Sequence, residues 1–268
     1  MFKKIIVFIM ILLTSTFAFS TVCMAAAGGV RIDDSAKDKG LVQISYSGRV
    51  GEKLKVMIAK GGTKYYYPLK PDGVLVGFPL QMGNGSYQVS VLKNLGDNRY
   101  TFLKTMTVSI KLDDPNVVYL NSIQTIKWTT ESAAVKKNLE LVGKETDYSK
   151  RVHLGYDFVV RNVSYDYAKI KTLTTDYTPD PDTTLKVLKG ICYDYSSLFA
   201  AMKRSEQIPV KLVKGYTSNV KGYHAWNEVF IDGKWVVVDT TFDSAYYKAR
   251  IKYSFSKRAA DYKKVYEY

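Results

Sequence analysis

A two-residue turn near the end of the chain constrains the fold more than any other feature of the sequence. Asp232-Gly233 stands between two apolar runs, and this dipeptide is a strong signal for a β-hairpin with a two-residue loop. Pairing Ile231 with Lys234 then fixes the register, because each step outward adds one residue from each strand. The sequence therefore predicts an antiparallel hairpin over residues 224–239.

This register brings a histidine close to an aspartate. Counting outward from the turn places Trp226 opposite Asp239 and makes His224 the diagonal neighbour of Asp239. Alternation puts all three side chains on one face, and a diagonal pair lies about 7–8 Å apart, within reach of an imidazole and a carboxylate. A slip of one residue would separate the two groups.

A cysteine precedes a predicted helix upstream of the hairpin. Residues 193–204 are rich in helix formers, and their apolar side chains can bury one side of the helix: Leu198, Phe199, Ala201 and Met202. Cys192 then stands at the helix N-terminus, where unpaired backbone N–H groups and the helix dipole favour a thiolate and can hold an oxyanion. Gly190 allows the backbone to bend just before the cysteine.

These three residues indicate thiol acyl-transfer chemistry. His224 can take the thiol proton of Cys192, while Asp239 fixes the orientation and tautomer of the ring. The chain has only two cysteines and two histidines, so the arrangement has few chances to arise by accident. A thioester formed this way is released by water, which gives a hydrolase, or by an amine, which gives a transferase.

Three segments resemble the transglutaminase-like superfamily: GICYDYSSLF at 190–199, HAWNEV at 224–229 and WVVVDTT at 235–241. The resemblance covers roughly residues 130–245. It implies a papain-like α+β core with Cys192 as nucleophile, His224 as base and Asp239 as orienting acid, and it implies no metal and no cofactor. The family includes cross-linking enzymes, proteases and amidases, so it leaves the acceptor open.

Further residues near these motifs have both functional and structural interpretations. By position in the resemblance, Tyr165 lines the cleft or donates a phenolic hydrogen bond to the oxyanion; a structural tyrosine is the alternative. Tyr193 and Trp226 are the other oxyanion or cleft candidates, although packing is the favoured role of the tryptophan. Asp194 is expected to cap the first helical turn, and His153 is expected to be a surface or core residue and no metal ligand.

The rest of the chain divides at Pro115 in this interpretation. Residues 28–115 are expected to form a small immunoglobulin-like β-sandwich, on the pattern of strand-like runs at 41–46, 54–58, 87–91 and 105–110. Residues 116–268 form the catalytic domain, with helical patterns at 132–141 and 147–161 and a proline-rich loop at 176–182. The predicted fold class is thus α+β, with a β-sandwich before the transglutaminase-like core.

Residues 1–27 are typical of a signal peptide. Lys3 and Lys4 precede an apolar run at 5–19, and small residues follow at 25–27. Cleavage there would remove Cys23 and leave Cys192 as the single cysteine of a secreted or envelope-associated protein; a lipid anchor on Cys23 is the less favoured alternative. No later segment is apolar and long enough to span a bilayer.

The chain is basic, with a formal net charge of +14. In an exported protein this charge suggests attraction to anionic cell-wall polymers, although a solvated basic surface without a partner explains it equally well. Nucleic acid is not expected, because the lysines are scattered and no motif appears. We expect a protein or peptide substrate, with hydrolysis slightly favoured over amine cross-linking. The alternative is a non-catalytic envelope adhesion or scaffold protein with the same fold.

Overall fold

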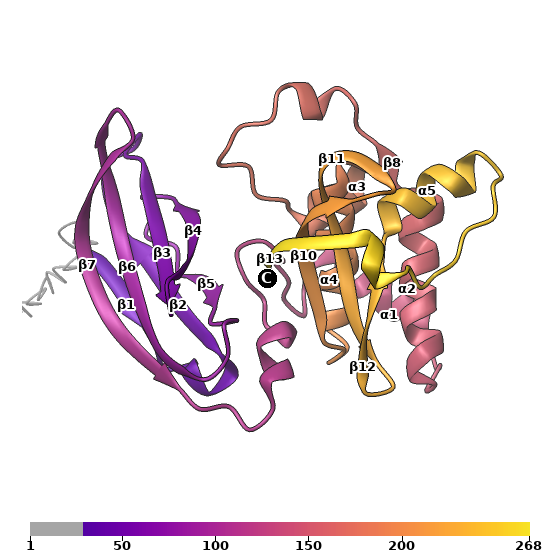
Figure 1. The fold of residues 1–268 in the computed structure, drawn as a ribbon, viewed down its shortest axis with the longest axis horizontal. Helices are drawn as coiled ribbons and strands as arrows, with labels where there is room; N and C mark the ends of the chain where they lie inside the picture. Colours follow the sequence, from indigo (N-terminus) through magenta and orange to yellow (C-terminus); the bar gives the residue numbers. More distant parts are fainter. Residues whose placement is uncertain (1–28) are drawn as a thin grey trace, which may run out of the picture.

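The computed structural model describes residues 29–268 of the chain. The predicted signal peptide and Cys23 lie outside the described residues. As the sequence predicted, the fold is α+β: β-sheets over residues 30–110 precede a mixed part that contains all five α-helices of the described chain. Figure 1 shows these two parts side by side. No helix within residues 29–268 is both long and apolar enough to cross a bilayer.

The N-terminal part consists of two antiparallel sheets that contribute to one buried core. One sheet has the order β1-β2-β5 and the other β4-β3-β6-β7. The strands are β1 (Val30–Asp33), β2 (Leu41–Tyr46), β3 (Leu54–Lys60), β4 (Thr63–Leu69), β5 (Val76–Pro79), β6 (Gly85–Gly96) and β7 (Arg99–Ile110). All four strand-like runs are strands, and β1, β4 and β5 are additional. The boundary at Pro115 and the immunoglobulin-like topology stay predictions.

The second part is built around a four-stranded sheet of order β12-β11-β10-β13. Its strands are β10 (Val210–Thr217), β11 (Val220–Ile231), β12 (Lys234–Val238) and β13 (Tyr262–Glu267). The helices are α1 (Ala133–Val142), α2 (Tyr148–Asn162), α3 (Pro181–Val187), α4 (Cys192–Arg204) and α5 (Thr240–Lys248), and β8 (Ser164–Tyr165) pairs in parallel with β9 (Lys189–Gly190). Short 3-10 helices are η1 (Lys37–Lys39), η2 (Pro115–Leu120), η3 (Lys169–Lys171) and η4 (Ala259–Asp261).

Helix α4 lies at the centre of this part, which differs from the expected one-sided burial. Every residue from Tyr193 to Arg204 is buried, because α4 packs on β10 and β11 and on the other four α-helices. Its two basic residues are compensated inside the protein. Arg204 donates to the carbonyl oxygens of Asn121, Val210 and Tyr268, and Lys203 forms an ion pair with Glu206. Buried charges are tolerated when they are paired or hydrogen-bonded in this way.

The prediction of a loop over residues 176–182 is wrong for its last two residues, which are helical. Helix α3 begins at Pro181, and the Asp180 side chain accepts a hydrogen bond from the Thr183 backbone N–H at 2.7 Å. Proline is favoured in the first turn of a helix, because its missing N–H has no intrahelical acceptor there. The second proline therefore starts a helix that it was expected to prevent.

The two parts of the chain meet at strand β13. Gln81 of the N-terminal part donates to the backbone oxygen of Glu267 at 3.1 Å. The rings of Tyr65 and Tyr67 lie edge-on to that of Tyr268, with centroids 5.8 and 5.9 Å away. In Figure 1, β13 is the yellow strand on the side of the second part that faces the β-sheets. This strand is thus held from both sides.

Candidate active site

Cys192 is the first residue of α4 and is half-buried. The start of the helix is fixed by Asp194, whose Oδ2 accepts the Ile191 backbone N–H at 2.8 Å and the Lys169 ammonium at 2.7 Å. The Tyr177 hydroxyl donates to the other oxygen of Asp194. The expected capping role of Asp194 is confirmed, and it holds the cysteine at the helix N-terminus.

The structure assigns Gly190 a different role from the expected one. Its φ is not positive, so no unusual bend requires glycine there. A Cβ at this position would lie 2.5 Å from the Cβ of Asp194. Glycine is therefore needed for space, because it lets the capping carboxylate fold back onto the chain.

The predicted hairpin is present in the predicted register. Asp232 and Gly233 have φ values of 49° and 75°, and β11 pairs with β12 from Ile231 opposite Lys234 to Asn227 opposite Val238. Asp239 then leaves the strand and caps α5, with its Oδ1 accepting the Phe242 backbone N–H at 3.0 Å. One oxygen of this carboxylate is used by the helix, and the other is free to face the hairpin.

His224 and Asp239 meet as the register predicts. His224 Nε2 lies 2.8 Å from Asp239 Oδ2, and the side chains are 3% and 0% exposed. Burial alone would lower the pKa of His224, but hydrogen bonds to Asp239 and to the Cys192 side chain outweigh it and raise this pKa to about 10. The structure thus brings all three predicted residues together, with the imidazole between the thiol and the carboxylate.

The three oxyanion or cleft candidates occupy different positions. Tyr165 lines a pocket together with His224, and burial, followed by the charge of Cys192, raises the pKa of Tyr165 to about 12. Its hydroxyl is therefore a protonated donor at neutral pH. Tyr193 is buried and does not line that pocket. Trp226 is 1% exposed and stacks beside the imidazole with centroids 6.4 Å apart, so it backs the ring and does not face the pocket.

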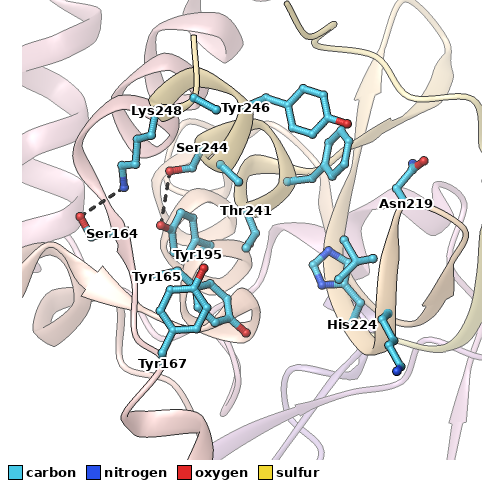
Figure 2. Close-up of a pocket in the computed structure, with 15 residues that line it drawn as sticks. Ser164, Tyr165, Tyr167, Tyr195, Asn219, His224, Thr241, Ser244, Tyr246 and Lys248 are labelled. Atoms are coloured by element: carbon cyan, nitrogen blue, oxygen red, sulfur yellow. Dashed lines mark hydrogen bonds between the residues drawn. The ribbon is translucent and has the colours of Figure 1, made fainter. Parts of the chain in front are cut away.

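A pocket of ≈ 930 Å³ opens next to His224. Figure 2 shows Tyr165, Tyr167 and Tyr195 grouped on one side of the pocket and His224 and Asn219 on the other. Lys248 closes one end, where its ammonium donates to the Ser164 hydroxyl at 3.2 Å. Pockets of about 300–1,000 Å³ are typical of small-ligand sites, and this pocket is within that range.

Two residues near the site were not predicted. The Lys214 ammonium lies 3.4 Å from the centroid of the Tyr193 ring. Tyr193 directly follows Cys192 in the sequence. Burial lowers the pKa of Lys214 to about 8, while the nearby Cys192 acts in the opposite direction. Tyr262 donates to Asp239 from β13. Lys214 lies in a segment that the resemblance includes, but nothing in the sequence shows what it faces.

The structure offers no metal site among residues 29–268: no three His, Cys, Asp or Glu side chains lie close enough to share an ion. His153 lies on α2 with Nδ1 2.8 Å from the Ser149 backbone oxygen and its ring 4.1 Å from that of Phe255. His153 therefore packs against Phe255, and its ring is partly buried.

The structure is a mixed α+β fold that brings a cysteine, a histidine and an aspartate together, and comparison with protein families shows what this part of the chain resembles. Residues 136–240 match the family model described as the transglutaminase-like superfamily. The matched segment contains Cys192, His224 and Asp239. This part of the chain is thus transglutaminase-like, and members of that superfamily are typically cysteine hydrolases or transferases.

Two curated proteins are similar to parts of the chain. A UPF0252 protein of Methanocaldococcus jannaschii is 32% identical over 92 residues, which cover 31% of this chain and 26% of that protein. Kyphoscoliosis peptidase of Homo sapiens is 24% identical over 153 residues, which cover 53% of this chain and 22% of the peptidase. The chain thus spans about a quarter of the length of these relatives.

Similar solved structures have low identity to the chain. A structure from Cytophaga hutchinsonii, described as a candidate cysteine protease, has a TM-score of 0.43 and 16% identity, covering 75% of this chain and 71% of that one. Red sea bream transglutaminase has a TM-score of 0.31 and 12% identity, covering 75% of this chain and 48% of that one. The family assignment rests on the sequence match over residues 136–240.

Proposed function

We propose that this protein is a cysteine acyl-transfer enzyme that uses Cys192, His224 and Asp239 as a catalytic triad. The observation that carries the proposal is the buried imidazole of His224, which contacts Asp239 at 2.8 Å and faces the Cys192 side chain. A protonated imidazole held between a carboxylate and a thiol stabilises the thiolate, which is the nucleophile.

The first half-reaction follows from these positions. The thiol proton passes to His224 Nδ1, because Nε2 is hydrogen-bonded to Asp239. The sulfur of Cys192 attacks the amide carbonyl, and the new oxyanion accepts hydrogen bonds from backbone N–H groups at the start of α4 and from the Tyr165 hydroxyl. The C–N bond then breaks, and the leaving amine takes the proton from His224. A thioester on Cys192 remains.

The second half-reaction decides the reaction type. Water attacks the thioester with His224 as general base, and the products are a carboxylic acid and the free thiol. An amine in place of water would give a new amide. We favour hydrolysis slightly, because water is always present whereas amine transfer needs a dedicated acceptor site. The name of the human relative, a peptidase, agrees with this preference.

The substrate class that we propose is a protein or peptide amide. The pocket next to His224 has room for a side chain and adjoining backbone. We also propose that the protein acts outside the cell or at the envelope, on the basis of the leader-like residues 1–27, and that its net charge of +14 favours contact with anionic wall polymers. Catalysis is assigned to residues 116–268.

The test compares the parent protein with Cys192→Ser, which exchanges one atom. Unfolded protein substrates are incubated with each in the presence of a lysine-mimicking fluorescent amine, and new amino termini and incorporated amine are counted. We expect the parent to release amino termini faster than it incorporates amine, and the variant to do neither. Faster incorporation would make the protein a transferase. The non-catalytic scaffold alternative would be supported if the parent had no activity and if the reactivity of the Cys192 thiol did not depend on His224.

A further inference from the structure

A tyrosine outside the matched family segment reaches the same carboxylate as the histidine. Tyr262 is the first residue of β13, and its hydroxyl donates to Asp239 Oδ2 at 3.0 Å. His224 Nε2 lies 2.8 Å from that same oxygen. The other oxygen, Oδ1, accepts the Phe242 backbone N–H at 3.0 Å. Asp239 is therefore fixed by three contacts, two of which share one oxygen.

The approach of β13 to this site depends on one glycine. A Cβ at Gly215 would lie 2.1 Å from the backbone oxygen of Lys263 and 2.9 Å from the Trp226 ring, so only glycine allows β13 to pass so close. Gly215 also stands opposite His224 on the neighbouring strand. The pairing of β10 with β13 shifts register at Lys214 and Gly215. This irregularity in the ladder moves β13 relative to β10 where the site begins.

The surroundings of Tyr262 keep its hydroxyl oriented as a donor. Asn219 lies with Nδ2 3.4 Å from the Tyr262 hydroxyl oxygen and can donate to it. The Tyr262 ring packs edge-on to Trp226 with centroids 5.0 Å apart, and Trp226 in turn stacks on His224. Burial, followed by the charge of Asp239, raises the pKa of Tyr262 well above its usual value. The hydroxyl thus remains protonated wherever the enzyme would work.

We propose that Tyr262 is a positioning residue that sets the orientation and acceptor strength of Asp239, so that β13 completes the active site. This inference rests on the proposed function and extends its site beyond the matched segment. A hydrogen bond to a carboxylate stabilises its charge and makes it a weaker acceptor for any other donor. The Tyr262 hydroxyl thereby weakens the hold of Asp239 on the imidazolium, which must release its proton to the leaving amine in every cycle.

A positioning role and a purely structural role of Tyr262 predict opposite changes in the pKa of His224 when the Tyr262 hydroxyl is removed. The titratable groups that face His224 are Cys192 on α4 and Asp239 before α5, with Tyr262 on β13 and Lys214 on β10 one contact further away. Tyr262→Phe keeps the ring and its packing on Trp226 but removes the donor. Asp239 then becomes the stronger acceptor for His224, so the imidazolium is stabilised and its pKa rises. General loosening of the fold would instead weaken the hydrogen bonds that His224 makes to Asp239 and Cys192, and its pKa would fall back toward the ordinary value of 6.5.

The experiment titrates His224 by NMR in full-length protein with labelled histidine. Only two histidines are present, so a His153→Gln spectrum assigns the signals. Tyr266→Phe is the matched control, because Tyr266 lies on the same strand and its hydroxyl has no hydrogen bond to any residue in 29–268. We expect the midpoint of His224 to rise by about half a unit to one unit in Tyr262→Phe and to stay unchanged in Tyr266→Phe. Turnover should fall about three- to tenfold in Tyr262→Phe with KM unchanged.

Two results would overturn the inference: an unchanged or lowered His224 midpoint in Tyr262→Phe, or equal shifts in both variants. The titration requires no substrate, so it separates this inference from the proposed function. If the parent shows no turnover on any amide, the proposed function fails, and the His224 midpoint still decides whether Tyr262 acts on Asp239. Thermal unfolding of both variants shows whether the fold is intact at the pH of each measurement.

Discussion

Two strands reach Asp239, and they are held in place by different means. Strand β11 is joined to β12 by a two-residue turn and paired with it over five consecutive positions, so the position of His224 follows from local connections. Strand β13 follows a long connection after α5, pairs with β10 through a register shift, and is fastened at its far end by the N-terminal sheets. The difference suggests that the His224–Asp239 pair is the rigid half of the site and the Tyr262 contact is the adjustable half.

The largest loss of turnover is expected from a substitution in the rigid half of the site, the His224–Asp239 pair. Asp239→Asn keeps the size of the side chain but removes the charge that holds the imidazolium, and it favours the wrong tautomer of His224. We expect turnover to fall by about 10³- to 10⁴-fold with little change in KM. Steady-state kinetics on the best peptide substrate would measure it. A loss no greater than that of Tyr262→Phe would erase the distinction between the two halves.

The approach of β13 is tested next by Gly215→Ala. The new methyl group must displace the backbone of Lys263, 2.1 Å away, so β13 has to move. We expect the free energy of unfolding to fall by about 1–3 kcal/mol and the His224 midpoint to rise as it does in Tyr262→Phe. Urea denaturation followed by circular dichroism measures the stability. An alanine variant as stable as the parent would show that β13 is not tightly placed.

A smaller effect, on the alkylation rate of Cys192, is expected from substitution of Lys214. This residue belongs neither to the His224–Asp239 pair nor to the Tyr262 contact. Its ammonium favours the thiolate of Cys192 while it is charged, and this support is lost as pH rises through about 8. We expect Lys214→Met to slow alkylation of Cys192 about two- to fivefold at pH 6–7 and to match the parent above about pH 9. Lys64→Met, at an exposed position on β4, is the control for net charge. A reduction that persists at high pH would contradict an electrostatic role.

The smallest effect concerns the fastening of β13 by the N-terminal sheets. Gln81→Ala removes the donor to the backbone oxygen of Glu267. We expect a loss of about 1 kcal/mol in the free energy of unfolding, with Cys192 alkylation unchanged, because Tyr262 lies at the other end of β13. Denaturant titration and alkylation kinetics on the same samples check both parts. A large change in alkylation would mean that the sheets control the site directly.

The parts of the site that could be predicted are those encoded by neighbouring residues. The turn at Asp232-Gly233 sets the hairpin, and the helix pattern after Cys192 sets α4, so the three reactive side chains follow from local sequence. Strand β13 pairs with β10 across a long stretch of chain and has no turn signal to announce it, so Tyr262 could not be predicted. The burial of α4 on all sides depends on which helices surround it, and an amphipathic pattern alone does not contain that information.

The pH dependence of Cys192 alkylation by iodoacetamide tests the central claim most directly. It is followed by mass spectrometry of the Cys192 peptide from pH 6 to 10, in the parent and in His224→Ala. Because Asp239 and Cys192 raise the pKa of His224 to about 10, most of the imidazole stays protonated up to about pH 9. For the parent protein, the account predicts fast alkylation at pH 6 and a rate that stays nearly level to about pH 9. At pH 6, the rate in His224→Ala should be lower than in the parent by about tenfold or more. A rate that climbs with pH like that of an ordinary thiol, with no effect of His224→Ala, would contradict it.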